Sequence, residues 1–456
     1  MTYLSRSGIL WLVALALGLL TSASAFGAQP PLDPSQYPAL AKDRAFQHWW
    51  WFYQQRAHPL GHIPHGARQR AHQQIEQSKA GRPHPLKQAQ GPAWTNIGPA
   101  PLLGGQIGAT GNTRPMSGRV TAIAVHPRDP NHRLIGAAQG GVWETTDSGN
   151  TWVPKTDGQA SLAVGAIAYA PSDPNTIYAA MGEANFSADS YVGEGVLKST
   201  DGGATWQLLA PDVFHSSSAI RVGPTNSTIV LVAATEGAAG RSGGTIDDVH
   251  GIFTSTDGGS TWVKKLNGQA TALEVDPRDF RRQLTGIGNP LSPFPFRLCD
   301  DPIQGRNGLY RSMDAGETWM LVNGPWEALP SACFNFGRVE LAIAPSNPNV
   351  AYVSIQQALI PFGGGGNLLG LWKTYDAWAD TPFWFLVPVG QTDDGSGNYG
   401  YCGWDLAFNQ ASPQCHYSHK IIVDPAFQEI LYAGGIPLWK LAGSTWIGEV
   451  SHTTTD

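Results

Sequence analysis

Residues 145–152 read TTDSGNTW, and three later segments repeat this pattern: STDGGATW at 199–206, STDGGSTW at 255–262 and SMDAGETW at 312–319. The common pattern is Ser/Thr-x-Asp-x-Gly-x-Thr-Trp. Each copy follows one β-prone run and precedes another, which predicts a tight turn between two strands. In such a turn the Asp accepts hydrogen bonds from backbone N–H groups two and three residues on, and the Gly supplies a positive φ. We therefore expect a structural role for Asp147, Asp201, Asp257 and Asp314.

The spacing of the copies predicts the fold. Successive aspartates lie 54, 56 and 57 positions apart, in the range of β-propeller blades with loop insertions. Two weaker copies follow, at 374–384 and 444–446. Upstream of each copy an alternating apolar run ends at a proline, and a period of two indicates a strand. Six such units between 117 and 450, each with four strands, predict an all-β propeller of four-stranded blades.

The segment before the first unit indicates a further blade. Residues 93–99 (AWTNIGP) resemble the outgoing Trp strand of a unit. We therefore predict that residues 93–456 form a truncated seven-bladed ring of which six blades are evident, with a complete six-bladed ring as the alternative. Residues 26–92 form a separate arm with predicted helices at 41–57 and 66–80. A helical hairpin packed on the propeller is one interpretation of this arm, and a propeptide or partner-docking arm is the other.

The first 25 residues have the features of a secretory signal peptide. Arg6 precedes an apolar stretch at 9–20, and an Ala-Ser-Ala cleavage pattern follows at 23–25. The apolar stretch is short for a membrane span, so the sequence predicts a secreted or periplasmic protein that is not membrane-spanning. The net charge of −6 gives no basic footprint for nucleic acid.

Export makes disulfides the expected state of the four cysteines. We expect the pairs Cys299–Cys333 and Cys402–Cys415 among the three possible connectivities. A Cys/His metal site that includes His416 and His419 is the alternative, but the spacing matches no standard zinc pattern. We predict no metal or other cofactor, with Ca²⁺ as an alternative occupant of the acidic loops.

Candidate binding residues gather in the long insertions. Nearly all of these insertions join second to third strands or one blade to the next, so they share the end of the ring opposite the repeated turns. Their acids and aromatics, together with two arginines at the start of innermost strands, form the candidate ligand-binding set: Arg119, Glu183, Asp189, Asp247, Asp248, Asp300, Asp301, Arg338, Asp393, Asp394 and Trp404. Carboxylates beside aromatic rings suit a glycan, and a suitably spaced pair could hydrolyse a glycosidic bond. Solvated loop positions are the alternative for each acid, and we expect Glu183 and Asp248 to be exposed.

The repeated pattern resembles the Asp-box, or BNR repeat, of β-propellers such as sialidases, xyloglucanases and the sortilin luminal domain. Sialidases carry an Arg-Ile-Pro motif, whereas the Ile-Pro pairs here, at 63–64 and 436–437, are not preceded by Arg. Residues 118–143 resemble xyloglucanases most. In that family the corresponding segment carries a catalytic Asp, and here residues 137–141 read AAQGG, without a carboxylate.

The resemblance implies a propeller that binds an extracellular ligand, a glycan or a protein, through its loop-rich end. Two alternatives remain: a xyloglucanase-like glycoside hydrolase, and a sortilin-like or assembly-factor scaffold for protein interactions. No catalytic residue is assigned, because Asp-box families differ in chemistry.

Overall fold

The computed structural model describes residues 47, 51, 54, 55, 57–60, 67–80, 102–103, 115–116, 118–185, 190–211, 213–235, 249–288, 306–328, 336–358, 367–389, 400–402, 415–435 and 438–447. This part of the chain is nearly all β. It contains one continuous helix, α3 (Ala67–Ala80), as the sequence predicts for 66–80. None of the described helices is long and apolar enough to cross a membrane.

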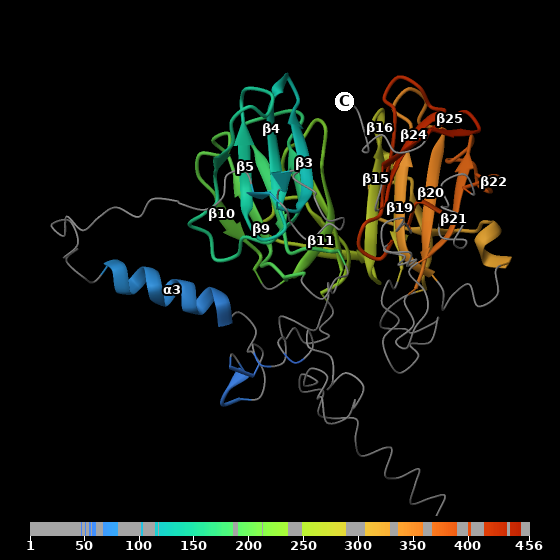
Figure 1. The fold of residues 1–456 in the computed structure, drawn as a ribbon. Helices are drawn as coiled ribbons and strands as arrows, with labels where there is room; N and C mark the ends of the chain where they lie inside the picture. Colours follow the sequence, from blue (N-terminus) through green and yellow to red (C-terminus); the bar gives the residue numbers. More distant parts are fainter. Residues whose placement is uncertain are drawn as a thin grey trace, which may run out of the picture. The chain divides into compact units, whose positions relative to one another are not determined.

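The described strands form a propeller of six four-stranded antiparallel sheets, here called blades 1 to 6 (Figure 1). In each blade the strands are adjacent in chain order, from the innermost to the outermost. Blades 1 to 3 consist of β3 (Val120–His126), β4 (Asp129–Ala137), β5 (Gly141–Thr145) and β6 (Val153–Pro154); β7 (Val164–Tyr169), β8 (Ile177–Met181), β9 (Val196–Ser199) and β10 (Gln207–Leu209); and β11 (Ser216–Val222), β12 (Val230–Thr235), β13 (Gly251–Ser255) and β14 (Val263–Leu266).

Blades 4 to 6 have the same organisation, and Figure 1 shows the fifth spreading from β19 to β22. They consist of β15 (Ala270–Asp276), β16 (Asp279–Ile287), β17 (Gly308–Ser312) and β18 (Met320–Val322); β19 (Phe336–Ile343), β20 (Ala351–Gln357), β21 (Leu368–Thr374) and β22 (Trp384–Leu386); and β23 (Lys420–Val423), β24 (Ile430–Gly434), β25 (Leu438–Ala442) and β26 (Thr445–Ile447). A separate two-stranded sheet pairs β1 (Leu102–Leu103) with β2 (Pro115–Met116). The predicted strand at Trp94 lies outside the described residues.

The core of the propeller lies between neighbouring blades. Five clusters of buried apolar side chains join blades 1 and 2, 2 and 3, 3 and 4, 4 and 5, and 5 and 6. The inner strands alternate as predicted: Ile167 and Tyr169 of β7 pack on Leu134 and Val142 of blade 1. Period-two patterning therefore places each of blades 2 to 5 between two apolar layers.

Each of the four repeated turns joins the third and fourth strands of its blade through one set of hydrogen bonds. In blade 2 the Ser199 hydroxyl donates to Asp201 Oδ1 at 2.7 Å and accepts the Gly203 N–H at 2.8 Å. Asp201 then accepts the Thr205 N–H on Oδ1 at 2.9 Å and the Thr205 hydroxyl on Oδ2 at 2.5 Å. The main backbone donor is thus Thr205, four residues on from the Asp, and the Ala204 N–H, three residues on as predicted, is a weaker donor. Gly202 and Gly203 supply two positive-φ positions in succession.

These bonds hold the pKa of Asp201 at about 2, through the hydroxyl and then the N–H of Thr205. Replacing Asp201 by Ala is expected to lower the free energy of unfolding, because the turn loses its central acceptor and four hydrogen-bonding groups lose their common partner. Urea denaturation at pH 7 measures this change. Lys265→Ala is the control. Lys265 forms an ion pair with Glu317, whose side chain is 53% exposed, so the pair should contribute less than about 1 kcal/mol to stability. Equal stability of the two variants would contradict the structural role of the turn.

Candidate functional site

The candidate residues that the structure describes lie at one end of the ring, here called the loop end. At this end the innermost strands begin and the second strands finish, because the strands of each blade alternate in direction. Arg119 precedes β3, Arg338 lies at the start of β19, and Glu183 follows β8. The repeated turns lie at the opposite end, the turn end. The strand ends from which the long connections leave therefore lie at one end of the propeller, while most residues of those connections lie outside the described part of the chain.

A triad of charged side chains, with a buried Glu between two cationic groups, lies at the loop end. Arg338 donates to Glu340 Oε1 through Nε at 2.9 Å and Nη2 at 2.7 Å, and Lys420 Nζ donates to Glu340 Oε2 at 2.7 Å. The Glu340 side chain is 1% exposed, whereas that of Lys420 is 63% exposed. Burial alone would raise the pKa of Glu340, but the charges of Lys420 and Arg338 outweigh it and lower that pKa. Glu340 is therefore ionised near neutral pH.

Two arginines connect residues of different blades. Arg338 of blade 5 donates through Nη1 to Asn185 Oδ1 at 2.9 Å and to the Tyr417 carbonyl at 3.0 Å. Asn185 lies between β8 and β9 of blade 2. Arg119, before blade 1, donates to the Tyr417 hydroxyl, before blade 6, and lies 4.9 Å from the centroid of that ring. Blades 2 and 5 stand three places apart in the ring, so this arginine network spans the axis of the propeller.

Glu183 is buried rather than exposed, which corrects the expectation from its loop position. Its carboxylate accepts the Arg119 guanidinium at 2.5 Å and the Asn185 amide at 3.2 Å, and its side chain is 1% exposed. The backbone explains the burial, because Glu183 forms a parallel bridge to Ser217 of β11. Burial raises the pKa of Glu183 against the opposing effect of Arg119.

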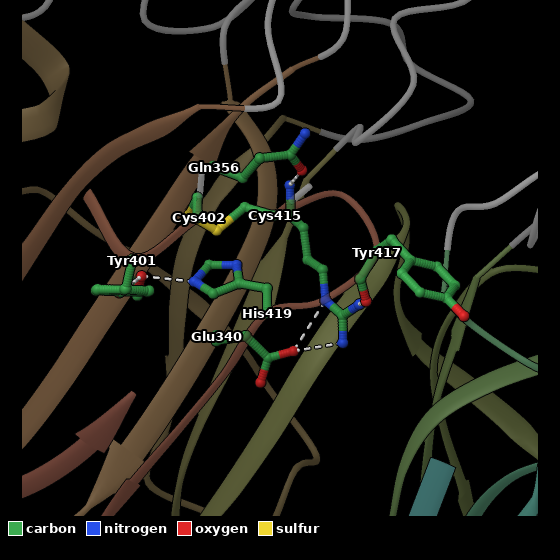
Figure 2. The surroundings of a disulfide bond; sticks show 9 residues. Glu340, Gln356, Tyr401, Cys402, Cys415, Tyr417 and His419 are labelled. Atoms are coloured by element: carbon green, nitrogen blue, oxygen red, sulfur yellow. Dashed lines mark hydrogen bonds and ion pairs between the residues drawn. A yellow bond between two sulfur atoms is a disulfide. The ribbon is translucent and has the colours of Figure 1, made fainter. Parts of the chain in front are cut away.

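The predicted disulfide Cys402–Cys415 is confirmed and lies beside this network (Figure 2). Both sulfurs are buried in the core between blades 5 and 6. Next to Cys402, Tyr401 shares a hydrogen bond of 2.5 Å with Ser354, whose hydroxyl also contacts His419 Nε2 at 2.6 Å. The disulfide thus ties the segment before β23 to a row of buried hydrogen-bonded side chains, Tyr401, Ser354 and His419, of which Ser354 lies on β20. Cys299 and Cys333 lie outside the described residues.

Two histidines next to the disulfide are held neutral. Burial lowers the pKa of His419 to about 3, although the Glu340 carboxylate acts against it. Burial and then the Arg338 charge lower the pKa of His416 to about 4. Among the residues that the structure describes, no group of three His, Cys, Asp or Glu could hold a metal ion.

The structure brings together Arg119, Glu183 and Arg338 of the predicted set. The remaining eight lie outside the described residues: Asp189, Asp247, Asp248, Asp300, Asp301, Asp393, Asp394 and Trp404. Sequence reasoning missed Glu340, although a Glu inside an apolar run that ends at Pro345 is a signal of a buried ion pair. It also missed Asn185 and Tyr417, which carry no such signal.

Comparisons with known proteins give xyloglucanases as relatives. No protein-family model matches the chain. A xyloglucanase of Hypocrea jecorina is 28% identical over 324 residues, which cover 63% of this chain and 34% of the relative. A xyloglucanase of Acetivibrio thermocellus is 24% identical over 307 residues, which cover 60% and 32%. The chain thus spans about a third of the length of these relatives.

A solved structure agrees with the fold. The crystal structure of an ancestral GH74 enzyme superimposes with a TM-score of 0.50 at 18% identity, and the match covers 71% of this chain and 36% of that chain. At such identity the likeness shows a shared fold. The chain is therefore a β-propeller similar to part of the xyloglucanases.

Proposed function

We propose that this protein binds a glycan at the loop end of its propeller, with a xyloglucan-type β-glucan as the first candidate. The observation that carries the proposal is the similarity to xyloglucanases over about 60% of the chain. The predicted signal peptide supports a secreted or periplasmic location, where polysaccharides are met.

The chemistry at the loop end suits sugar hydroxyls. Lys420 is mostly exposed, the Arg119 side chain is 22% exposed, and Tyr417 is partly exposed beside it. These groups offer charged donors next to an aromatic ring, and their partners Glu340 and Glu183 fix their positions. Sugar recognition needs such oriented polar groups on a rigid scaffold.

Binding is favoured over hydrolysis by the state of the described carboxylates. A glycosidase needs two carboxyl groups that flank the scissile bond. Glu340 is fully buried and held by two cations, so it cannot reach a substrate. Among the described residues, Glu183 is the one carboxyl of the network with a raised pKa, which is the property of a general acid. Its side chain is, however, also 1% exposed and paired with Arg119, so it would have to become accessible to a substrate. Hydrolysis is therefore the second candidate function and would require a loop aspartate as the partner of Glu183.

The test is binding of the purified chain to xyloglucan, cellulose and mannan, by affinity electrophoresis and calorimetry, with reducing-sugar release measured in parallel. Lys420→Ala is expected to weaken retention by a factor of about 5–150, the loss of one charged hydrogen bond of about 1–3 kcal/mol. The matched control is Arg281→Ala at the turn end, whose side chain is 73% exposed and should leave binding unchanged.

Three outcomes separate the candidates. Retention without sugar release supports a binding propeller, and release that is abolished by Glu183→Gln supports the hydrolase. If none of the polysaccharides is retained or cleaved, the glycan proposal is wrong, and a protein partner becomes the leading alternative.

A further inference from the structure

Blade 5 departs from the other repeats in the turn between its third and fourth strands. In blades 1 to 4 three positions of this turn are exposed: the residue before the Asp, the residue before the Trp and the residue after the Trp. Most of them are threonines: Thr146, Thr151 and Val153; Thr200, Thr205 and Gln207; Thr256, Thr261 and Val263; Met313, Thr318 and Met320. In blade 5 all three positions are aromatic, as Tyr375, Phe383 and Phe385.

The hydrogen bonds of the turn confirm that these positions correspond. Asp376 Oδ1 accepts the Phe383 N–H at 3.0 Å, and in blade 1 Asp147 Oδ1 accepts the Thr151 N–H at 2.9 Å. Phe383 is seven positions on from its Asp, whereas Thr151 is four positions on. The insertion in blade 5 therefore keeps the backbone bond of the turn and places an aromatic ring where the other four blades carry a Thr.

The three rings form one exposed surface, here called the aromatic platform. Phe385 lies at its centre, with its ring centroid 4.7 Å from that of Phe383 and 6.0 Å from that of Tyr375, edge to face in both cases. Tyr375, Phe383 and Phe385 are 49%, 64% and 48% exposed. Phe385 belongs to β22, the outermost strand of blade 5 (Figure 1). The platform therefore lies on the outer rim of the turn end, whereas the arginine network lies at the loop end.

Polar groups beside the platform fix the position of Tyr375. Lys373, whose side chain is 8% exposed, donates to the Tyr375 hydroxyl at 2.8 Å and lies 4.2 Å from the centroid of its ring. The Tyr375 hydroxyl donates in turn to Glu429 Oε1 at 3.2 Å, and Glu429 also pairs with Lys373. The Glu429 side chain is 41% exposed, so its carboxylate is an accessible acceptor beside the rings. Aromatic faces next to a few oriented polar groups are the composition of a ligand site.

The size and charge of the platform favour a neutral sugar chain. Three aromatic side chains that present about half of some 150–250 Å² each offer on the order of 300 Å². Each partner of a stable protein interface buries about 800 Å², so a second protein chain would need much more surface. The carboxylates of Asp376, Asp380 and Glu429 outnumber Lys373, which disfavours an anionic ligand. The C–H faces of a pyranose can stack on the rings, and its hydroxyls can donate to Glu429.

We propose that the aromatic platform of blade 5 is a second glycan-binding site, which takes a neutral sugar chain by stacking. The inference rests on the proposed function for the class of ligand, but it places the contact at the opposite end of the propeller. The platform binds and does not cleave, because its carboxylate Glu429 is held by Lys373 and Tyr375. A polysaccharide bound there would keep the protein attached while the loop end releases its own ligand.

The test gives blade 5 the residues that blade 1 carries at these positions. The triple variant Tyr375→Thr/Phe383→Thr/Phe385→Val should fold, because a threonine hydroxyl at position 383 can donate to the turn Asp as the Thr151 hydroxyl does in blade 1. Its affinity for xyloglucan, measured by affinity electrophoresis, should fall at least about tenfold, or about 1.4 kcal/mol. An unchanged melting temperature shows that the loss is not caused by unfolding.

Two control variants isolate the role of the rings. Phe383→Tyr/Phe385→Tyr keeps both rings and should retain binding. Val263→Thr changes the equivalent of Phe385 in blade 3, which is 56% exposed, and should also leave binding unchanged. Loss of binding in either control equal to that in the triple variant would overturn the proposal, because the effect would then not depend on aromatic stacking.

Comparison with Lys420→Ala separates this inference from the proposed function. A loss in the triple variant but not in Lys420→Ala supports the platform and refutes the loop-end site. A loss in Lys420→Ala with full binding of the triple variant overturns the platform and leaves the loop-end site intact. If light scattering detects a dimer of the native chain that the triple variant does not form, the rings bind a second copy and the glycan assignment is wrong.

Discussion

Replacing Glu340 by Gln is expected to lower the free energy of unfolding by about 3–5 kcal/mol, the usual cost of removing one partner of a buried ion pair. Gln keeps the size of the side chain, so the loss comes from charge and not from a cavity. Arg338, whose side chain is 10% exposed, would keep its charge without the carboxylate that faces it. Urea denaturation at pH 7.5 measures the change.

Two controls separate the charge effect from general damage. Lys420→Met removes the exposed partner and should cost less than about 1 kcal/mol. The double variant Arg338→Met/Glu340→Leu removes both buried charges and should recover at least half of the loss, because apolar replacements of buried pairs are often neutral or stabilising. A loss below about 1 kcal/mol for Glu340→Gln would show that water reaches the pair.

Lowering the pH is expected to destabilise the protein at pH values well above those at which its aspartates titrate. His419 and His416 have folded-state pKa values of about 3 and about 4, below their ordinary value of 6.5. The unfolded chain therefore binds their protons first, and stability present above pH 6.5 is lost as the pH falls toward 4 and 3. Between pH 6.5 and 4.5 the two histidines together should cost about 4 kcal/mol, at 1.36 kcal/mol for each pKa unit.

Other titrating groups also change the stability as the pH falls. Glu183 has the opposite effect to the histidines: because its pKa is raised in the folded state, the folded chain binds this proton first and gains stability. The turn aspartates, with pKa values of about 2, act only below pH 4. The measurement is urea denaturation at half-unit steps of pH, for the native chain and for His416→Gln/His419→Gln. If the free energy of unfolding falls equally in the native chain and in the double variant between pH 6.5 and 4.5, the assignment to the histidines is wrong.

The sequence predicts what is repeated or local. Pro127 and Pro171 each follow a run in which apolar residues alternate, and the structure has the strands β3 and β7 in these runs. Cys402 and Cys415 are separated by 13 positions, which made their pairing predictable. The residues of the turn were predicted correctly, and the predicted donor three positions on contributes, but the main backbone donor lies four positions on. Ser148 and Ala315 adopt a positive φ there without being Gly.

The candidate site was predictable only in part, because its contacts join distant positions. Arg338 and Asn185 are 153 positions apart, and Arg119 and Tyr417 are 298 apart. Whether Glu183 is exposed depends on the parallel bridge that places it against β11. A periodic pattern contains no information on such pairings, since each depends on loop lengths and ring geometry.

The contact of Arg338 with Asn185 also affects how the protein unfolds on heating. In a solenoid each repeat touches only its neighbours, so a weakened repeat can melt while distant ones persist. Here a blade in the second half of the chain holds the loop of one in the first half across the axis. Fraying of either blade would remove support from the other. Thermal unfolding should therefore be more cooperative than a linear array of six sheets would allow.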